Sequence, residues 1–190
     1  MAKPQTTTTR DRIERAAMRL FVRTGVSDTT IRDIAHAVGV SEGALYRHFA
    51  SKEELVWSLF ERHYTAFARR LQAVAAAQDS ARNKVAAMIR EFCRAHDDDP
   101  TLFRFLLFVQ HGQLEKLAPD AVTPVTVVRD VLASAIAAGD IPAQQPELAT
   151  ALVFGAVLEP AQFAAYGSLP ATIAPLSDRL ADAAWAAVTA

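Results

Sequence analysis

An all-α fold of about nine helices is what the 190-residue sequence predicts, on three observations. Apolar residues recur at positions i, i+3, i+4 and i+7 along most of the chain, which is the spacing of one helix face. Alternation with a period of two, typical of half-buried strands, is absent. Residues that start helices (Ser, Thr, Pro) and residues that stop them (Gly) separate the periodic segments.

The first two helices follow from apolar spacing and from their end signals. An amphipathic helix begins near residue 12 and ends at Gly25, since glycine suits a helix C-terminus. A second helix of barely two turns begins at residue 31. Thr30 and Asp33 fit a capping box at its start, and Gly39 ends it.

A third short helix and a long fourth helix follow directly. Ser41 is a suitable N-cap, and Leu45 and Phe49 share one face because they lie four residues apart. Ser51 and Glu54 form a second S-x-x-E box, which opens the long helix. We therefore predict a three-helix domain over 1–55 and a helical domain over 56–190.

The C-terminal domain is expected to hold the remaining helices. The segment 102–109, LFRFLLFV, is so uniformly apolar that we predict a central position for it. Gly139 is the expected end of a helix over 124–138. Pro160 should kink or interrupt the helix that starts at Pro146, because proline removes a hydrogen-bond donor. A last helix begins near Ser177.

Composition favours a folded cytoplasmic protein. The chain is 51% hydrophobic and 22% charged, which argues against disorder. Thr150 and Gly139 interrupt the longest apolar runs, so we expect no membrane span. The first ten residues are polar and lack the apolar core of a signal peptide. Cys93 is the only cysteine, so no intrachain disulfide can form.

Charge is distributed unevenly along a chain whose net formal charge is −1. Residues 1–50 carry eight Lys/Arg and five Asp/Glu, whereas 51–190 carry twelve Lys/Arg and sixteen Asp/Glu. A basic N-terminal part on an acidic remainder suggests that one end faces a polyanion.

The second and third predicted helices, joined by Val38-Gly39-Val40, have the spacing of a helix-turn-helix. In such a motif the first helix packs across the sugar-phosphate backbone and the second lies in the major groove. With Leu45 and Phe49 pointing inward, Gly43 and Arg47 lie on the opposite face. The third helix therefore exposes small residues beside hydrogen-bonding ones, which lets its backbone approach base edges.

The stretch TTIRDIAHAVGVSEGALYRHFASKEEL (29–55), preceded by RIERAAMRLFVRTG (12–25), resembles the N-terminal domain of the TetR family of transcriptional regulators. The GVS turn, the L-Y-x-H-F core and the S-K-E-E-L that follows carry the resemblance over the first third of the chain. It implies an all-α homodimer that binds a pseudo-palindromic operator. It also implies release by a small ligand held in the C-terminal domain.

Carried over by position, the resemblance implies DNA contacts for a set of ten residues. Tyr46, His48 and Lys52 match positions that hold phosphates, and Thr30, together with Thr29, would donate to a phosphate at a helix start. The full set is Thr29, Thr30, Arg32, Glu42, Gly43, Ala44, Tyr46, Arg47, His48 and Lys52.

Some members of this set have two readings. Glu42 either accepts from a cytosine amine or sits favourably at a positive helix N-terminus. Ala44 offers only a methyl group, suited to thymine. Arg47 is either a phosphate contact or a solvated side chain. Of the other basic residues, Arg10 and Lys3 are the two suited to reach DNA.

An aromatic and mostly apolar group in the C-terminal domain predicts an effector site, with ordinary core packing as the alternative. Its members are Trp57, Phe92, His96, Phe103, Phe105, Leu106, Phe108 and Gln110. The Ala-rich helices near 146–166 and 176–189 predict the homodimer interface, because small residues let helices approach closely.

The expected function is a dimeric, ligand-responsive repressor without metal or cofactor, with activation as an alternative that the sequence leaves open. Enzyme motifs such as a P-loop, G-x-S-x-G or H-E-x-x-H are absent from the sequence. Two alternatives remain. One is a ligand-binding or scaffold protein of the same fold without operator binding. The other is an enzyme that uses Cys93, His96 and His111.

Overall fold

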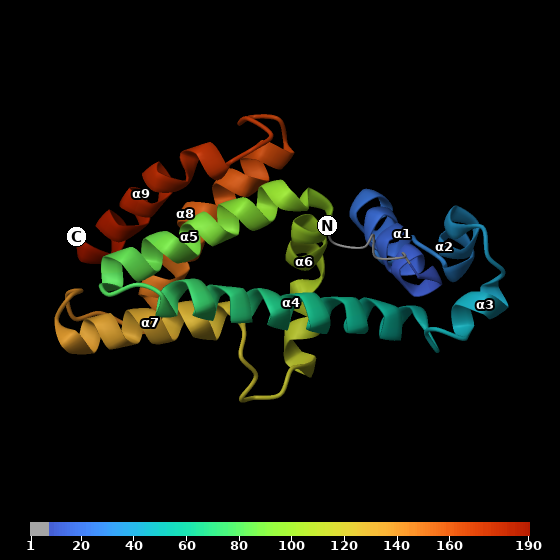
Figure 1. Cartoon of the computed structure of the whole chain (residues 1–190), viewed down its shortest axis with the longest axis horizontal. Coiled ribbons are helices and arrows are strands. Elements are labelled where there is room, and N and C mark those ends of the chain that lie inside the picture. The colour runs from blue at the N-terminus through green and yellow to red at the C-terminus, as the bar shows by residue number, and fades with distance from the viewer. Residues whose placement is uncertain (1–7) are drawn as a thin grey trace, which may run out of the picture. The chain divides into compact units, whose positions relative to one another are not determined.

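The computed structural model describes residues 8–190, and these form nine α-helices and two short 3-10 helices. The prediction of an all-α fold is confirmed (Figure 1). The α-helices are α1 Thr9–Thr24, α2 Ile31–Val38, α3 Glu42–Tyr46, α4 Lys52–Ala76, α5 Ala81–Asp98, α6 Pro100–Gln113, α7 Pro124–Ala138, α8 Pro146–Ala165 and α9 Ser177–Thr189; the 3-10 helices are η1 Leu114–Lys116 and η2 Ala174–Leu176.

Contacts divide the chain into two compact units. The N-terminal unit holds the residues up to His63 together with Thr101–Ala118, and the C-terminal unit holds Tyr64–Pro100 and Pro119–Ala190. Helix α4 supplies residues to both units. Helix α6 lies with the first three helices, although it is distant from them in sequence. The sequence predicted a domain boundary after residue 55, and this boundary stays a prediction.

The predicted helix ends are present. Thr30 and Asp33 form a reciprocal capping box on α2, and Gly39 closes that helix with a φ of 73°. Gly139 ends α7 with a φ of 82°, a left-handed conformation that favours glycine. At the start of α4, the Ser51 hydroxyl accepts from the Glu54 N–H at 3.1 Å. Local side-chain chemistry thus sets where these helices begin and end.

The core of the N-terminal unit joins α6 to the first helices. The rings of Phe21 (α1) and Phe105 (α6) stack with centroids 6.1 Å apart, and both side chains are buried. Glu14 on α1 is also buried, and its carboxylate accepts from Arg10 and from Arg62 of α4. A buried carboxylate needs such partners because its desolvation is costly.

The prediction that the apolar segment 102–109 is central holds for one face only. Phe103, Phe105 and Val109 are buried, whereas Phe108 is 60% exposed. The Arg104 guanidinium carbon lies 5.8 Å from the centre of the Phe108 ring. A helix with 3.6 residues per turn buries one face and exposes the other. A segment that is apolar on all faces does not indicate which face is buried, so the prediction was wrong for Phe108.

The C-terminal unit has an aromatic core braced by polar contacts. The Phe92 ring lies edge-on to Phe67 (4.8 Å between centroids) and to Phe154 (5.4 Å). Beside it on α5, the buried Glu91 accepts from Arg70 and Arg94. On its outer face, α5 pairs with α9 through two exposed ion pairs. They are Arg82–Asp182 at 2.9 Å and Arg90–Asp178 at 2.8 Å.

Helix α8 is not interrupted at Pro160, and its apolar run is not broken at Thr150. Its mean hydropathy of 1.5, with about a third of that window buried, gives it the length and composition of a membrane span. Thr150 therefore does not break the apolar run; its hydroxyl donates to the Pro146 carbonyl at 2.7 Å. Such a helix also occurs in the core or interface of soluble proteins.

Candidate DNA-binding surface

The start of α2 presents Thr30 at the surface. The Thr30 hydroxyl donates to the Asp33 carboxylate at 2.6 Å, and the Thr30 N–H donates to the same carboxylate at 2.9 Å. These two hydrogen bonds hold the pKa of Asp33 below its ordinary value. Arg32, one residue further along, is exposed. Both Thr30 and Arg32 are therefore accessible to a partner.

Helix α3 divides sharply into a buried and an exposed face. The Ser41 hydroxyl caps it by accepting from the Ala44 N–H at 3.1 Å, while Leu45 and Phe49 are almost completely buried, as predicted. The predicted base-facing and phosphate-facing residues lie on the other side. Glu42, Gly43, Tyr46 and Arg47 are exposed, and Ala44 and His48 are half-buried. The Tyr46 side chain is 50% exposed, so its phenol is accessible to a partner.

Two predicted phosphate contacts lie in a different environment. Thr29 is 1% exposed, and its hydroxyl donates to the Gly25 carbonyl at 2.7 Å. The Lys52 ammonium donates to the carbonyls of Val26 (2.8 Å), Ser27 (3.3 Å) and Thr29 (3.0 Å). Sequence position alone did not reveal the Lys52 contacts, because their acceptors are backbone atoms more than twenty residues away in the chain.

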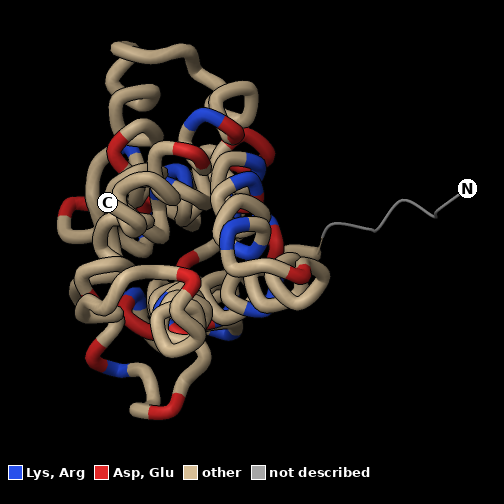
Figure 2. Tube along the Cα trace, turned by 90° about the vertical axis from the view of Figure 1, so that its left-hand side faces the viewer, with Lys and Arg blue, Asp and Glu red and all other residues tan. Residues whose placement is uncertain are grey.

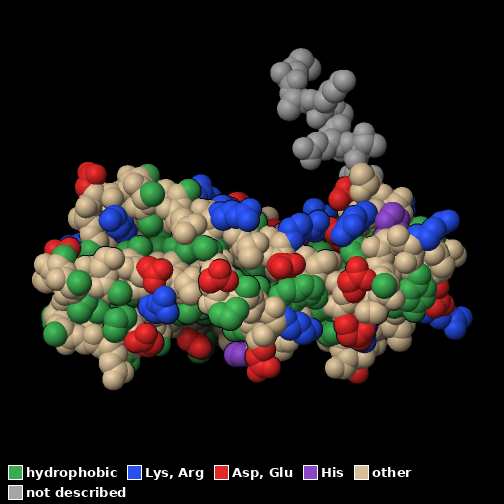
Figure 3. All heavy atoms as spheres, turned by 90° about the horizontal axis from the view of Figure 1, so that it is seen from below, with side chains coloured by type: hydrophobic (Ala, Val, Ile, Leu, Met, Phe, Trp, Pro, Cys, Tyr) green, Lys and Arg blue, Asp and Glu red, His purple; other side chains and the backbone are tan. Residues whose placement is uncertain are grey.

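Basic residues near the motif are largely engaged within the protein. Arg10 pairs with Glu14, and its guanidinium lies 4.7 Å from the centre of the Phe49 ring. Arg12 donates to the Val38 carbonyl at 2.6 Å. Lys3 lies outside the described residues. Figure 2 shows Lys and Arg interspersed with Asp and Glu along the trace, and Figure 3 shows both signs mixed with apolar patches on one face. DNA affinity would thus rest on local contacts instead of a strongly basic surface.

The residues predicted to bind an effector fall in both units. Trp57, Phe103, Phe105, Leu106, Phe108 and Gln110 belong to the N-terminal unit, and Phe92 and His96 to the C-terminal unit. Phe92 is packed between two rings, and the buried His96 lies 2.8 Å through Nδ1 from the Asp97 carboxylate. Within the C-terminal unit, these two residues therefore belong to the packed core, the alternative that the sequence left open.

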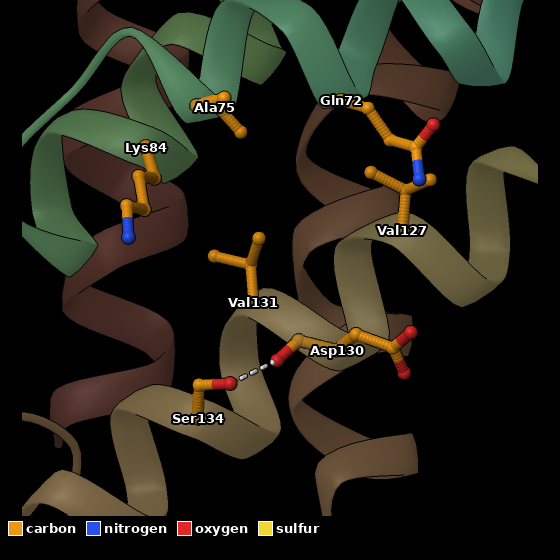
Figure 4. A pocket seen from close by; sticks show the side chains of 8 residues that line it. Gln72, Ala75, Lys84, Val127, Asp130, Val131 and Ser134 are labelled. Carbon is orange, nitrogen blue, oxygen red and sulfur yellow. Dashed lines mark hydrogen bonds between the residues drawn. The ribbon is translucent and has the colours of Figure 1, made fainter.

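A hollow in the C-terminal unit is lined by residues that the sequence did not indicate. It lies between α4, α5 and α7 and has a volume of about 310 Å³. In Figure 4, Ala75, Lys84 and Val131 face one another from these three helices, while the Asp130 carboxylate extends away. The Ser134 hydroxyl donates to the Asp130 carbonyl at 2.8 Å. The sequence predicted a helix over 124–138 but no pocket along it.

The residues of the enzyme alternative are not arranged as a reactive centre. Cys93 is fully buried, and burial together with the negative charge of Asp97 raises the pKa of its thiol to about 11. The thiol is therefore protonated near neutral pH and a poor nucleophile. Across residues 8–190, three or more His, Cys, Asp or Glu side chains nowhere gather in a way that could hold a metal ion. His111 is exposed on α6, in the N-terminal unit.

Comparison with known proteins identifies the N-terminal helices. A family model described as "Bacterial regulatory proteins, tetR family" matches residues 13–59. The transcriptional regulator TtgR of Pseudomonas putida is 46% identical over 59 residues, which cover 31% of this chain and 28% of TtgR. The transcriptional regulator AcrR of Shigella flexneri is 44% identical over 62 residues. Less than a third of these relatives' length is matched.

Similarity of fold extends over nearly the whole chain. A TetR-family regulator from Marinobacter aquaeolei superposes with a TM-score of 0.79 at 20% identity, covering 95% of each chain. The transcriptional regulator FadR of Bacillus subtilis, solved in complex with stearoyl-CoA, gives a TM-score of 0.72 at 20% identity, covering 91% of this chain and 96% of FadR. The family whose model matches residues 13–59 consists of transcriptional regulators and not of enzymes. The helix-turn-helix of α2 and α3 thus matches the TetR family model, and the nine α-helices of residues 8–190 have the fold of a solved TetR-family regulator.

Proposed function

We propose that the protein is a homodimeric, ligand-responsive transcriptional regulator of the cytoplasm, most simply a repressor. The exposed face of α3 carries this proposal. Leu45 and Phe49 fix α3 and the residues after it to the unit, and the outer side of this segment offers Tyr46, Arg47 and the half-buried His48. A short helix with a rigid inner face and a hydrogen-bonding outer face suits the major groove.

The proposed contacts divide into two kinds. Tyr46, Arg47 and His48, with Thr30 at the start of α2, hold phosphates and set the register on the duplex. Glu42, Gly43 and Ala44 face the bases, and the exposed Arg32 is placed to reach either. Because Gly43 has open space where a side chain would be, the helix backbone can come close to base edges.

Dimerisation through α8 and α9 is supported by the exposed apolar surface of α8. Large apolar side chains there are uncovered: Leu148 53%, Leu152 37%, Phe163 50% and Tyr166 71% exposed. A second copy of the chain would remove this surface from water. A symmetric dimer would place its recognition helices about 34 Å apart, one turn of DNA.

The proposed effector is an amphipathic small molecule. FadR of Bacillus subtilis was solved with stearoyl-CoA, a ligand with an apolar chain and an anionic head. Here the hollow between α4, α5 and α7 offers Val127 and Val131 as apolar walls and Lys84 as a cation. The effector releases DNA if it binds the DNA-incompetent conformation more tightly.

Selection of bound duplexes from a random DNA pool tests the function. We expect an enriched pseudo-palindrome with half-sites one helical turn apart, bound with an affinity that falls steeply with salt. Enrichment of a single half-site would contradict the dimer. Failure to enrich any sequence would favour the alternative of a ligand-binding or scaffold protein that has lost operator binding.

A further inference from the structure

The ammonium of Lys52 is surrounded by backbone carbonyls. Lys52 is the first residue of α4, and the three oxygens that it contacts, those of Val26, Ser27 and Thr29, belong to the turn between α1 and α2. A lysine ammonium has three N–H donors and no acceptor. Three acceptors at 2.8 to 3.3 Å thus match its full donor capacity.

The turn that Lys52 holds determines where α2 begins. Thr29, whose carbonyl accepts from Lys52, is buried, and its hydroxyl donates to the Gly25 carbonyl at 2.7 Å. The next residue, Thr30, is the N-cap of α2. A displacement of the Lys52 ammonium would therefore move the first turn of α2, to which the Thr30 hydroxyl belongs.

The other end of α2 is held in the same manner. Arg12 of α1 donates to the carbonyl of Val38, the last residue of α2, at 2.6 Å. One cation from α1 and one from α4 thus bind carbonyls on either side of the helix. Charge-assisted hydrogen bonds are stronger than neutral ones. Helix α2 is thereby fixed at both ends with respect to the helices next to it.

We propose that Lys52 is a positioning residue of the DNA-binding unit and not a phosphate contact. It attaches the first turn of α4 to the start of α2, so that α2 and α3 keep the orientation in which their outer faces meet DNA. The inference rests on the proposed operator binding for its effect on DNA, but its structural part can be measured without DNA.

The test compares Lys52→Met with Lys52→Arg on the duplex that the wild-type protein selects and on a random-sequence duplex. A phosphate contact would lower the slope of log K against log salt by about 0.9 per protomer in Lys52→Met, and Lys52→Arg would restore it. A positioning role leaves the slope unchanged. Both variants then bind the selected duplex about tenfold more weakly, while binding to random DNA changes little.

Hydrogen exchange of the backbone amides of α2 supplies the DNA-independent arm. We expect faster exchange in both Lys52 variants and unchanged exchange in Arg69→Met, which removes an exposed cation from the same helix. If Lys52→Met does not fold, Lys52→Arg is judged by the same two measurements. A reduced salt slope, or unaltered exchange in α2, would overturn the proposal. Failure of the wild-type protein to select any duplex would count against operator binding, whereas the exchange result would still decide the role of Lys52.

Discussion

Helix α3 and helix α8 each leave a surface that one chain alone does not cover, but the two surfaces differ in chemistry. On α3 and the two residues after it, the side chains that reach the surface are the exposed Glu42, Tyr46 and Arg47 and the half-buried His48, all with polar groups. On α8 they are leucines, a phenylalanine and a tyrosine spread over twenty residues. The first surface can form hydrogen bonds to a hydrated polyanion. The second gains stability only by leaving water.

In the proposed function, this difference in chemistry keeps the DNA-binding surface of α3 and the dimer interface of α8 from binding each other's partner. An apolar surface does not attract DNA, and a small polar helix does not dimerise strongly, because its groups are already hydrated. If the two surfaces are separate in this way, substitutions on α8 should change the oligomeric state first. Substitutions on α3 should change DNA binding without affecting the dimer.

The largest effect is expected from Leu152→Glu on α8. Two copies of the glutamate would lie in the apolar interface, and burying unpaired charges there should raise the dimer dissociation constant at least 100-fold. Analytical ultracentrifugation measures this directly. Val122→Glu is the matched control, because Val122 is also an exposed apolar residue (44%) but lies outside α8 and α9. Equal dimer dissociation constants for the two variants would show that α8 is not part of the interface.

Tyr46→Ala should weaken operator binding by ten- to 100-fold, since each dimer loses two phosphate contacts of about 1 kcal/mol each. Fluorescence anisotropy with the selected duplex measures the loss, and sedimentation should show an intact dimer. Tyr46→Phe separates the hydroxyl from the ring. If Tyr46→Phe binds as the wild-type protein does, the ring packs against DNA and does not donate to it.

Arg47→Met has a smaller and more specific expected effect. If the guanidinium binds a phosphate, the slope of log K against log salt decreases by about 0.9 per protomer. A solvated arginine would leave the slope unaltered. In that case Arg47 contributes only to the overall electrostatic potential of the N-terminal unit. Affinity titrations at several salt concentrations distinguish the two roles of Arg47 that the sequence left open.

The smallest effect concerns the segment that joins α8 to α9. Burial alone would raise the pKa of Asp97, but hydrogen bonds from His96 and from the N–H groups of Ile173 and Ala174 outweigh it and hold that pKa below its ordinary value of 3.8. Asp97 therefore stabilises the folded chain above that pH, and the contribution is lost as pH falls through the lowered pKa.

Asp97→Asn should reduce the free energy of unfolding at pH 7 by about 1 kcal/mol, because a neutral acceptor binds less strongly. It should also flatten the acidic part of the pH profile of stability. Urea denaturation at pH 7 and pH 3 measures both changes. A variant with the same pH profile as the wild-type protein would show that Asp97 is not a source of acid sensitivity.

The sequence predicted those features whose cause is local. Thr30, Ser41 and Gly39 delimit helices through atoms within four residues, so their roles could be inferred from spacing alone. Leu45 and Phe49 were identified as buried because a helix repeats its faces regularly.

Features that depend on distant partners were missed. Lys52 has a typical sequence position for a DNA contact, but its ammonium donates to carbonyls more than twenty residues away, in the turn between α1 and α2. Likewise, Phe92 and Phe108 belong to one predicted effector group, yet Phe92 is enclosed by two rings and Phe108 is exposed. No periodicity distinguishes them, because the packing of other helices decides which side of an apolar segment is covered.

The buried Cys93 makes this protein convenient for spectroscopy. A thiol with no exposed surface and a pKa of about 11 should resist maleimide and methanethiosulfonate reagents in the native state, and it is the only cysteine of the chain. A new cysteine such as Ala50→Cys, at an exposed position just after α3, would therefore carry a spin label at one place per protomer. Electron-spin distance measurements between the two labels of a dimer could then follow the separation of the recognition helices directly, with and without a candidate effector.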